Sequence, residues 1–96
     1  MKMVMIVHYA PITEEVMEAL ERLGVKTYTR IPQVQGVGGS SNPRFDSHIW
    51  PGFNNIIFTV VEDKKAKELV EAIRGLKDRF REEGIKAFIL SIEDMV

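Results

Sequence analysis

The stretch GVGGSSNPRFDSHIWPG, residues 36–52, lies between two runs of strand-forming residues and decides how the rest of the chain is interpreted. It holds four of the seven glycines, two of the four prolines and the single tryptophan of this 96-residue chain. Glycine and proline are typical of turns and loops, so we expect an irregular connection here. Long loops in compact domains are usually functional or disordered, which makes this segment the first candidate for a site.

The runs on either side of this loop predict two strands, one over residues 25–35 and the other over residues 55–61. Pro32 lies in the first of them and cannot donate a hydrogen bond to a neighbouring strand, so we expect an open or bulged edge near it. Farther from the loop, residues 3–9 and 85–92 are compact apolar runs that predict the first and last strands.

Two helices are predicted between these strands, because apolar residues recur there at helical spacing. The first is expected to have Thr13 as its N-cap and to end at Gly24, and the second to have Asp63 as its N-cap and to end at Gly84. Right-handed crossovers then place both helices on one face of the sheet. The predicted fold is α+β, a ferredoxin-like βαββαβ plait with a four-stranded antiparallel sheet, and residues 1–96 are expected to form a single domain.

The composition excludes several classes of function. A net charge of −1 provides no basic field to hold nucleic acid, and the absence of cysteine removes disulfides, thiolate metal sites and thiol nucleophiles. No serine lies in a nucleophile elbow, so we expect a protein that is not an enzyme. Residues 1–10 are too short an apolar run to span a membrane and are followed by no cleavage site, so we expect a cytoplasmic protein without direct membrane insertion.

The chain resembles the PII-like superfamily, the trimeric signalling proteins that include the nitrogen regulatory protein PII, and is identified as a divergent member. The similarity covers nearly the whole length, and the motifs follow in the family's order. They are GVGGSS at residues 36–41, where PII proteins open their long T-loop, Pro51 before the third strand, VEAI at residues 70–73, GIKAF at residues 84–88 and IED at residues 92–94. The resemblance implies a homotrimer, which would also cover the sheet face that the plait leaves bare.

The departures from the family bear on ligand binding. No tyrosine lies within residues 36–52, which excludes control by uridylylation of the T-loop, and residues 77–84 read KDRFREEG where the family has a glycine-rich B-loop. Lys77, Arg79, Arg81 and Lys86 are candidate replacements for the B-loop cations. Acidic neighbours dilute them, so a solvated helix face is the favoured interpretation.

The predicted ligand-binding residues lie at the start of the loop, where glycines allow backbone N–H groups to approach an anion closely. They are Gln35, Gly36, Gly38, Gly39 and Ser40. An adenine nucleotide is the leading candidate for the effector, on the strength of the resemblance, and a divalent metal is the alternative.

The remaining loop residues predict partner binding or metal binding. Arginine and tryptophan are enriched at interface hot spots, so Arg44, Phe45, His48 and Trp50 form the predicted partner-binding set, with Arg44 at the tip. His48 and Asp46 are suitable ligands for a divalent metal. His8, on the first strand, is expected to be a packed strand residue.

Three functions remain open from the sequence. The first is a non-enzymatic trimeric regulator that binds a small effector, a nucleotide or an anion, at the base of the loop and engages a target, a membrane transporter or an enzyme, through the loop. The second is a divalent-metal-responsive accessory protein that uses His48 and Asp46. The third is a structural trimeric adaptor without a ligand. We expect residues 38–47 to be loose until an effector or target orders them.

Overall fold

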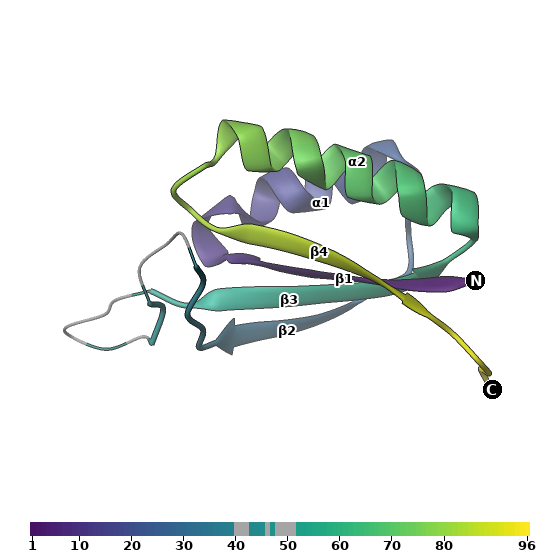
Figure 1. Ribbon diagram of the computed structural model, residues 1–96, viewed down its shortest axis with the longest axis horizontal. Helices are drawn as coiled ribbons and strands as arrows, with labels where there is room; N and C mark the ends of the chain where they lie inside the picture. The colour runs from purple at the N-terminus through teal and green to yellow at the C-terminus, as the bar shows by residue number, and fades with distance from the viewer. Residues whose placement is uncertain (40–42, 46, 48–51) are drawn as a thin grey trace.

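The computed structural model describes residues 1–39, 43–45, 47 and 52–96. The elements follow in the order β1 (Lys2–Tyr9), a 3₁₀ turn (Ala10–Ile12), α1 (Thr13–Arg22), β2 (Thr29–Val34), β3 (Asn54–Val61), α2 (Asp63–Arg79) and β4 (Ile85–Ser91). Figure 1 shows the described residues between β2 and β3 at one end of the sheet. The predicted βαββαβ order is confirmed.

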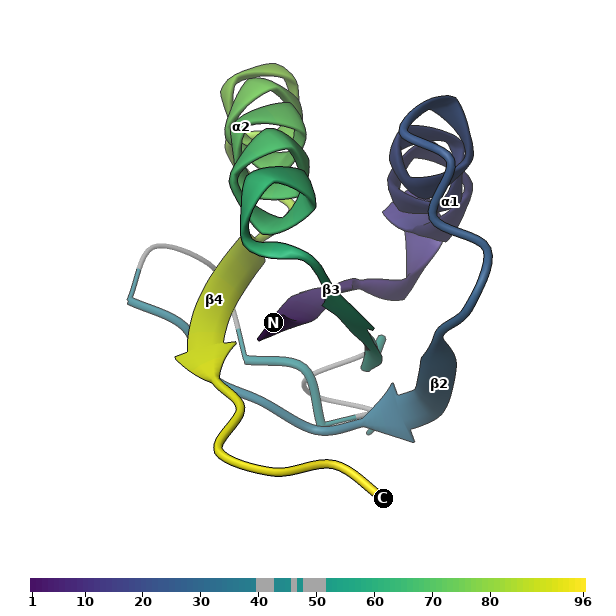
Figure 2. The same ribbon diagram turned by 90° about the vertical axis from the view of Figure 1, so that its right-hand side faces the viewer.

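The four strands form one antiparallel sheet in the order β2-β3-β1-β4. β1 is central, because it pairs with β3 on one side and β4 on the other, with Ile6 opposite both Ile57 and Ala87. Figure 2 shows both helices on the same face of this sheet. The ferredoxin-like plait predicted from the sequence is therefore confirmed.

The core lies between the sheet and the two helices. Burial alternates along β1 and β3 with the two-residue period of a strand, so that one face of each points at the helices. The innermost side chains are fully buried and come from both layers, namely Val4, Ile6, Val16, Leu20, Ile57 and Leu69. No helix in the described ranges is long and apolar enough to cross a membrane.

The other face of the sheet carries apolar side chains that no helix covers. Phe88 and Leu90 of β4 lie opposite Met5 and Met3 of β1, and cross-strand partners share a face. Phe88 is 48% exposed, Leu90 is 43% exposed, and Ile31 on β2 is 41% exposed. An uncovered apolar sheet face was expected from the sequence, and this exposure agrees with it.

The helix starts differ from the expectation. Thr13 is the first residue of α1, and its hydroxyl donates to the Ala10 carbonyl oxygen at 2.6 Å, because a 3₁₀ turn leads the chain into the helix. Asp63 is likewise the first residue of α2, and its carboxylate lies 3.2 Å from the N-terminal ammonium of Met1. Both N-cap predictions are therefore wrong.

Several boundaries also move. Gly24 ends α1 as predicted, with a φ of 72°, and the Val25 amide donates to the Leu20 carbonyl oxygen at 2.9 Å. This closing turn delays β2, which begins at Thr29 and not at residue 25. Helix α2 ends at Arg79, before Gly84, and Gly84 leads into β4 with a φ of 82°.

The irregularity expected near Pro32 is present. The pairing of β2 with β3 shifts register between Ile31 and Val34, and Gln33 adopts a φ of 58°. Proline has no N–H to donate to the ladder, which accounts for a bulge at this point.

Candidate functional site

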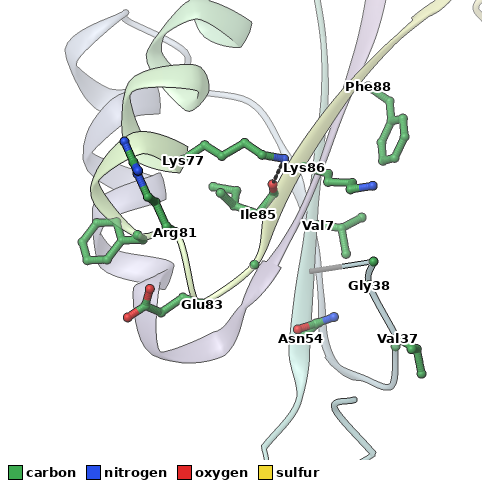
Figure 3. Close-up of a pocket in the computed structure, with 14 residues that line it drawn as sticks. Val7, Val37, Gly38, Asn54, Lys77, Arg81, Glu83, Ile85, Lys86 and Phe88 are labelled. Atoms are coloured by element: carbon green, nitrogen blue, oxygen red, sulfur yellow. Dashed lines mark hydrogen bonds between the residues drawn. The ribbon is translucent and has the colours of Figure 1, made fainter. Parts of the chain in front are cut away.

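A cavity lies where the beginning of the loop passes the end of α2 and the start of β4 (Figure 3). Its volume is about 210 Å³, and residues 36–39 form one wall. The opposite wall comes from the segment that joins α2 to β4 and includes Phe80, Arg81 and Gly84. The fold thus brings a glycine-rich backbone beside residues that lie more than forty positions later in the chain.

The cavity has a positive lining. Lys77, Arg81 and Lys86 line it, and Glu83 is the single carboxylate among the described lining residues, which gives a formal charge of +2. The Lys77 ammonium donates to the Ile85 carbonyl oxygen at 3.2 Å, the dashed contact in Figure 3, so that this cation is held beside the first residue of β4.

Three of the four candidate B-loop cations therefore belong to the site. All four are exposed, as expected for a solvated helix face, but Lys77, Arg81 and Lys86 also line the cavity. Arg79 does not; its guanidinium lies 5.0 Å from the centre of the Phe80 ring.

The predicted ligand-binding glycines line the cavity, but the residue before them does not. Gly36, Gly38 and Gly39 are lining residues, whereas the Gln35 side chain donates to the Phe45 carbonyl oxygen at 3.0 Å and holds the loop. A Cβ at Gly36 would lie 2.9 Å from Asn54 Nδ2, so a side chain at residue 36 would displace Asn54. Ser40 lies outside the described residues.

The loop is closed near its base by a short bridge. The Gly36 amide donates to the Arg44 carbonyl oxygen at 2.8 Å, and the Arg44 amide donates to the Gly36 carbonyl oxygen at 2.7 Å. Arg44 was expected at the tip of the loop, and the structure places it in this bridge instead. Its guanidinium lies 4.1 Å from the centre of the Tyr9 ring, in cation–π contact.

The Tyr9 ring also lies against Gly52, at the C-terminal end of the loop. Gly52 has a φ of 89°, and a Cβ there would lie 2.8 Å from Tyr9 Cε1. The end of β1 therefore lies against the loop at two points, Arg44 and Gly52. Of the other predicted partner-binding residues, Phe45 is partly buried, and His48 and Trp50 lie outside the described residues.

The predicted metal ligands also fall outside the described residues. This applies to both Asp46 and His48. Within the ranges that the structure describes, no three histidine or acidic side chains gather as a metal site would require.

A buried polar cluster lies beneath the base of the loop, on the helix side of the sheet. His8 is 1% exposed, as the packed-residue prediction required, and its Nε2 lies 2.9 Å from the Thr13 hydroxyl oxygen. The same oxygen accepts a hydrogen bond from Asn55 Nδ2 at 2.9 Å. Burial, and secondly the nearby Arg30 guanidinium, lowers the pKa of His8 to about 4, so His8 is neutral at neutral pH.

Solved structures of other proteins share this fold. The chain has a TM-score of 0.77 with CPII, a nitrogen regulatory PII-like protein from Thiomonas intermedia K12 bound to ADP, AMP and bicarbonate, at 20% identity over 95% of this chain and 84% of that one. For a PII-like signalling protein from Thermus thermophilus the TM-score is 0.63 and the identity 26%, over 92% and 82% of the two chains. No curated protein matches the chain.

The family assignment rests on the whole length of the sequence. The family model described as nitrogen regulatory protein P-II matches residues 1–96. The plait, the long connection between β2 and β3, and the likeness to PII-like structures agree with that match. The chain therefore belongs to the nitrogen regulatory protein P-II family.

Proposed function

We propose that this protein is a non-enzymatic PII-like regulator that binds a small anionic effector, foremost an adenine nucleotide, at the base of the loop. The observation that carries the proposal is a cavity lined both by residues 36–39 and by the cations Lys77, Arg81 and Lys86. Glycines let backbone N–H groups approach phosphate oxygens, and the three cations supply the opposite charge. Phe80 and Phe88 add aromatic surface for a base.

The likeness to CPII supports the choice of effector. That protein has been seen with ADP, AMP and bicarbonate, which are all anions. The two chains share 20% of their residues, so the ligand class for this chain rests on its own cavity. Adenine nucleotides satisfy both the charge and the aromatic surface of this cavity, whereas bicarbonate satisfies only the charge.

The uncovered sheet face supports a homotrimer. Ile31, Phe88 and Leu90 are exposed on it from both edges of the sheet, and association would remove them from water. A cavity lined partly by an edge strand would then lie close to a neighbouring subunit. The loop, with Arg44, Phe45, His48 and Trp50, would engage a target protein in the cytoplasm, either a membrane transporter or an enzyme.

Calorimetric titration with ADP, AMP and bicarbonate tests the proposed site. We expect ADP to bind, and Lys86→Ala to weaken it about tenfold, because a hydrogen bond to a charged group contributes about 1.5–3 kcal/mol. Gly38→Val should abolish binding, since a branched side chain keeps the phosphate from the backbone.

Lys64→Ala is the matched control, because Lys64 is an exposed lysine at the opposite end of α2. It removes the same charge from the protein and should leave the affinity unchanged. Absence of ADP, AMP and bicarbonate binding at millimolar concentrations, or equal losses in Lys86→Ala and Lys64→Ala, would contradict the proposal.

A further inference from the structure

We propose that Asn55, with Thr13 and His8, is a positioning residue that fixes the path of the glycine stretch along the effector cavity. None of the three side chains lines the cavity. They act through the bulge in β2, which immediately precedes the loop. This inference deepens the proposed function, because it names the residues that hold that site in shape.

Only one assignment of donors and acceptors satisfies all the hydrogen bonds of the cluster. The Thr13 hydroxyl donates its one proton to the Ala10 carbonyl oxygen, so its two lone pairs accept, one from Asn55 Nδ2 and one from His8 Nε2. Neutral His8 must therefore carry its proton on Nε2. With the Asn55 amide orientation fixed in this way, its Oδ1 is left to accept from elsewhere.

That oxygen accepts from the bulge. The backbone N–H of Gln33 donates to Asn55 Oδ1 at 3.1 Å, at the point where the β2–β3 register shifts. Gln33 has a φ of 58°, a left-handed conformation that is unfavourable for a residue other than glycine. A conformation of this kind persists only where its surroundings hold it, and the buried Asn55 amide is such a support.

The bulge sets where the glycine stretch runs. After Gln33 the strand resumes its pairing with Val34 opposite Asn54, and Gly36 then passes so close to Asn54 that a Cβ on residue 36 would lie 2.9 Å from Asn54 Nδ2. Asn54 and Asn55 are consecutive residues of β3 and point to opposite faces. Asn55 thus holds the bulge from the helix side, while Asn54 contacts Gly36 at the cavity. A slip of one residue in β2 would turn the side chains of β2 to the opposite faces of the sheet and change where residues 36–39 pass Lys86.

Thr59 provides a matched control for this cluster. It lies on the same helix-facing side of β3, is 3% exposed, and its hydroxyl donates to the Thr27 carbonyl oxygen at 2.6 Å. Thr59→Val and Thr13→Val therefore each remove one hydrogen-bonded hydroxyl, the first from a buried threonine of β3 and the second from a partly buried threonine of α1. Both should destabilise the fold, but only Thr13→Val disturbs the bulge.

The test measures amide hydrogen exchange by NMR and ADP affinity by calorimetry on the full chain. In Asn55→Leu and in Thr13→Val we expect the Gln33 and Gly36 amides to exchange about fivefold to tenfold faster, the factor that follows from one lost hydrogen bond. The ADP dissociation constant should rise by a similar factor. Thr59→Val should leave both quantities unchanged.

Two results would overturn the inference. One is unchanged exchange at Gln33 and Gly36 in both Asn55→Leu and Thr13→Val; if Asn55→Leu does not fold, Thr13→Val decides alone. The other is an equal change in Thr59→Val, which would show a general loss of stability. If the wild-type protein does not bind ADP, the proposed function fails, whereas the exchange rates still report whether the cluster holds the bulge.

Discussion

Acidification should destabilise the protein through His8. Its pKa is lowered from 6.5 to about 4 in the folded state, first by burial and then by the Arg30 guanidinium, so the unfolded chain binds a proton more readily between these two values. The folded state must therefore lose stability as the pH falls from about 6.5 to about 4. At about 1.4 kcal/mol for each pH unit, the loss amounts to about 3 kcal/mol.

The structure gives a further reason for the low pKa of this imidazole. Its Nε2–H already donates to the Thr13 hydroxyl, and its buried Nδ1 has no hydrogen-bond partner among the described residues. A second proton on Nδ1 would therefore be a buried charge without an acceptor. At neutral pH His8 is uncharged, and its contribution to stability is fully present.

Urea denaturation of the wild type and of His8→Gln at several pH values between 4 and 7 measures this effect. Glutamine has no titratable group but retains an N–H that can donate to Thr13. Other groups titrate equally in both proteins and cancel in the difference. The wild type should lose about 3 kcal/mol more than His8→Gln across this range. Parallel pH profiles of the two proteins would refute the assignment of a buried, neutral His8.

Two further predictions concern the loop and the assembly. Gly52→Ala should cost clearly more stability than Gly24→Ala: both glycines have a positive φ, but a methyl group at Gly24 meets open space and costs about 1 kcal/mol, whereas one at Gly52 meets the Tyr9 ring. Equal losses of stability in Gly52→Ala and Gly24→Ala, measured by thermal denaturation, would mean that Tyr9 does not hold the end of the loop at Gly52. Light scattering should give a mass about three times 11.0 kDa, and Phe88→Asp, which puts a charge on the uncovered sheet face, should give the monomer mass. A wild-type protein that is monomeric at micromolar concentration would contradict the trimer.

The plait could be predicted from the sequence because its signals are local and periodic. Alternating burial in β1 and β3 follows the two-residue period of their apolar residues. Pro32 predicts the bulge in β2 because proline has no N–H to donate to a neighbouring strand. The two N-cap predictions were wrong for an equally local reason. The rule that a threonine or aspartate before an apolar run caps the helix takes no account of the 3₁₀ turn before Thr13 or of the Met1 ammonium beside Asp63.

The site could be predicted only in part. The glycines at residues 36, 38 and 39 are conspicuous in the sequence, and they line the cavity. The position of Lys86 in the cavity is not conspicuous, because a lysine near acidic residues looks like any solvated lysine until the fold places it in the same lining as those glycines. Asn55 carries no sequence signal except a polar residue at the helix-facing position of a strand, which predicts a buried partner without identifying it.

The contacts of Tyr9 have a mechanical consequence. If a target pulls on the loop, as the proposed function requires, part of the load would pass from Arg44 to the Tyr9 ring, against which Gly52 also lies, and from there to β1. β1 is hydrogen-bonded to β3 on one side and to β4 on the other along nearly its whole length. Load that passes through Tyr9 would therefore be borne in shear by two strand ladders at once, whereas load along the backbone reaches β3 and the edge strand β2 directly.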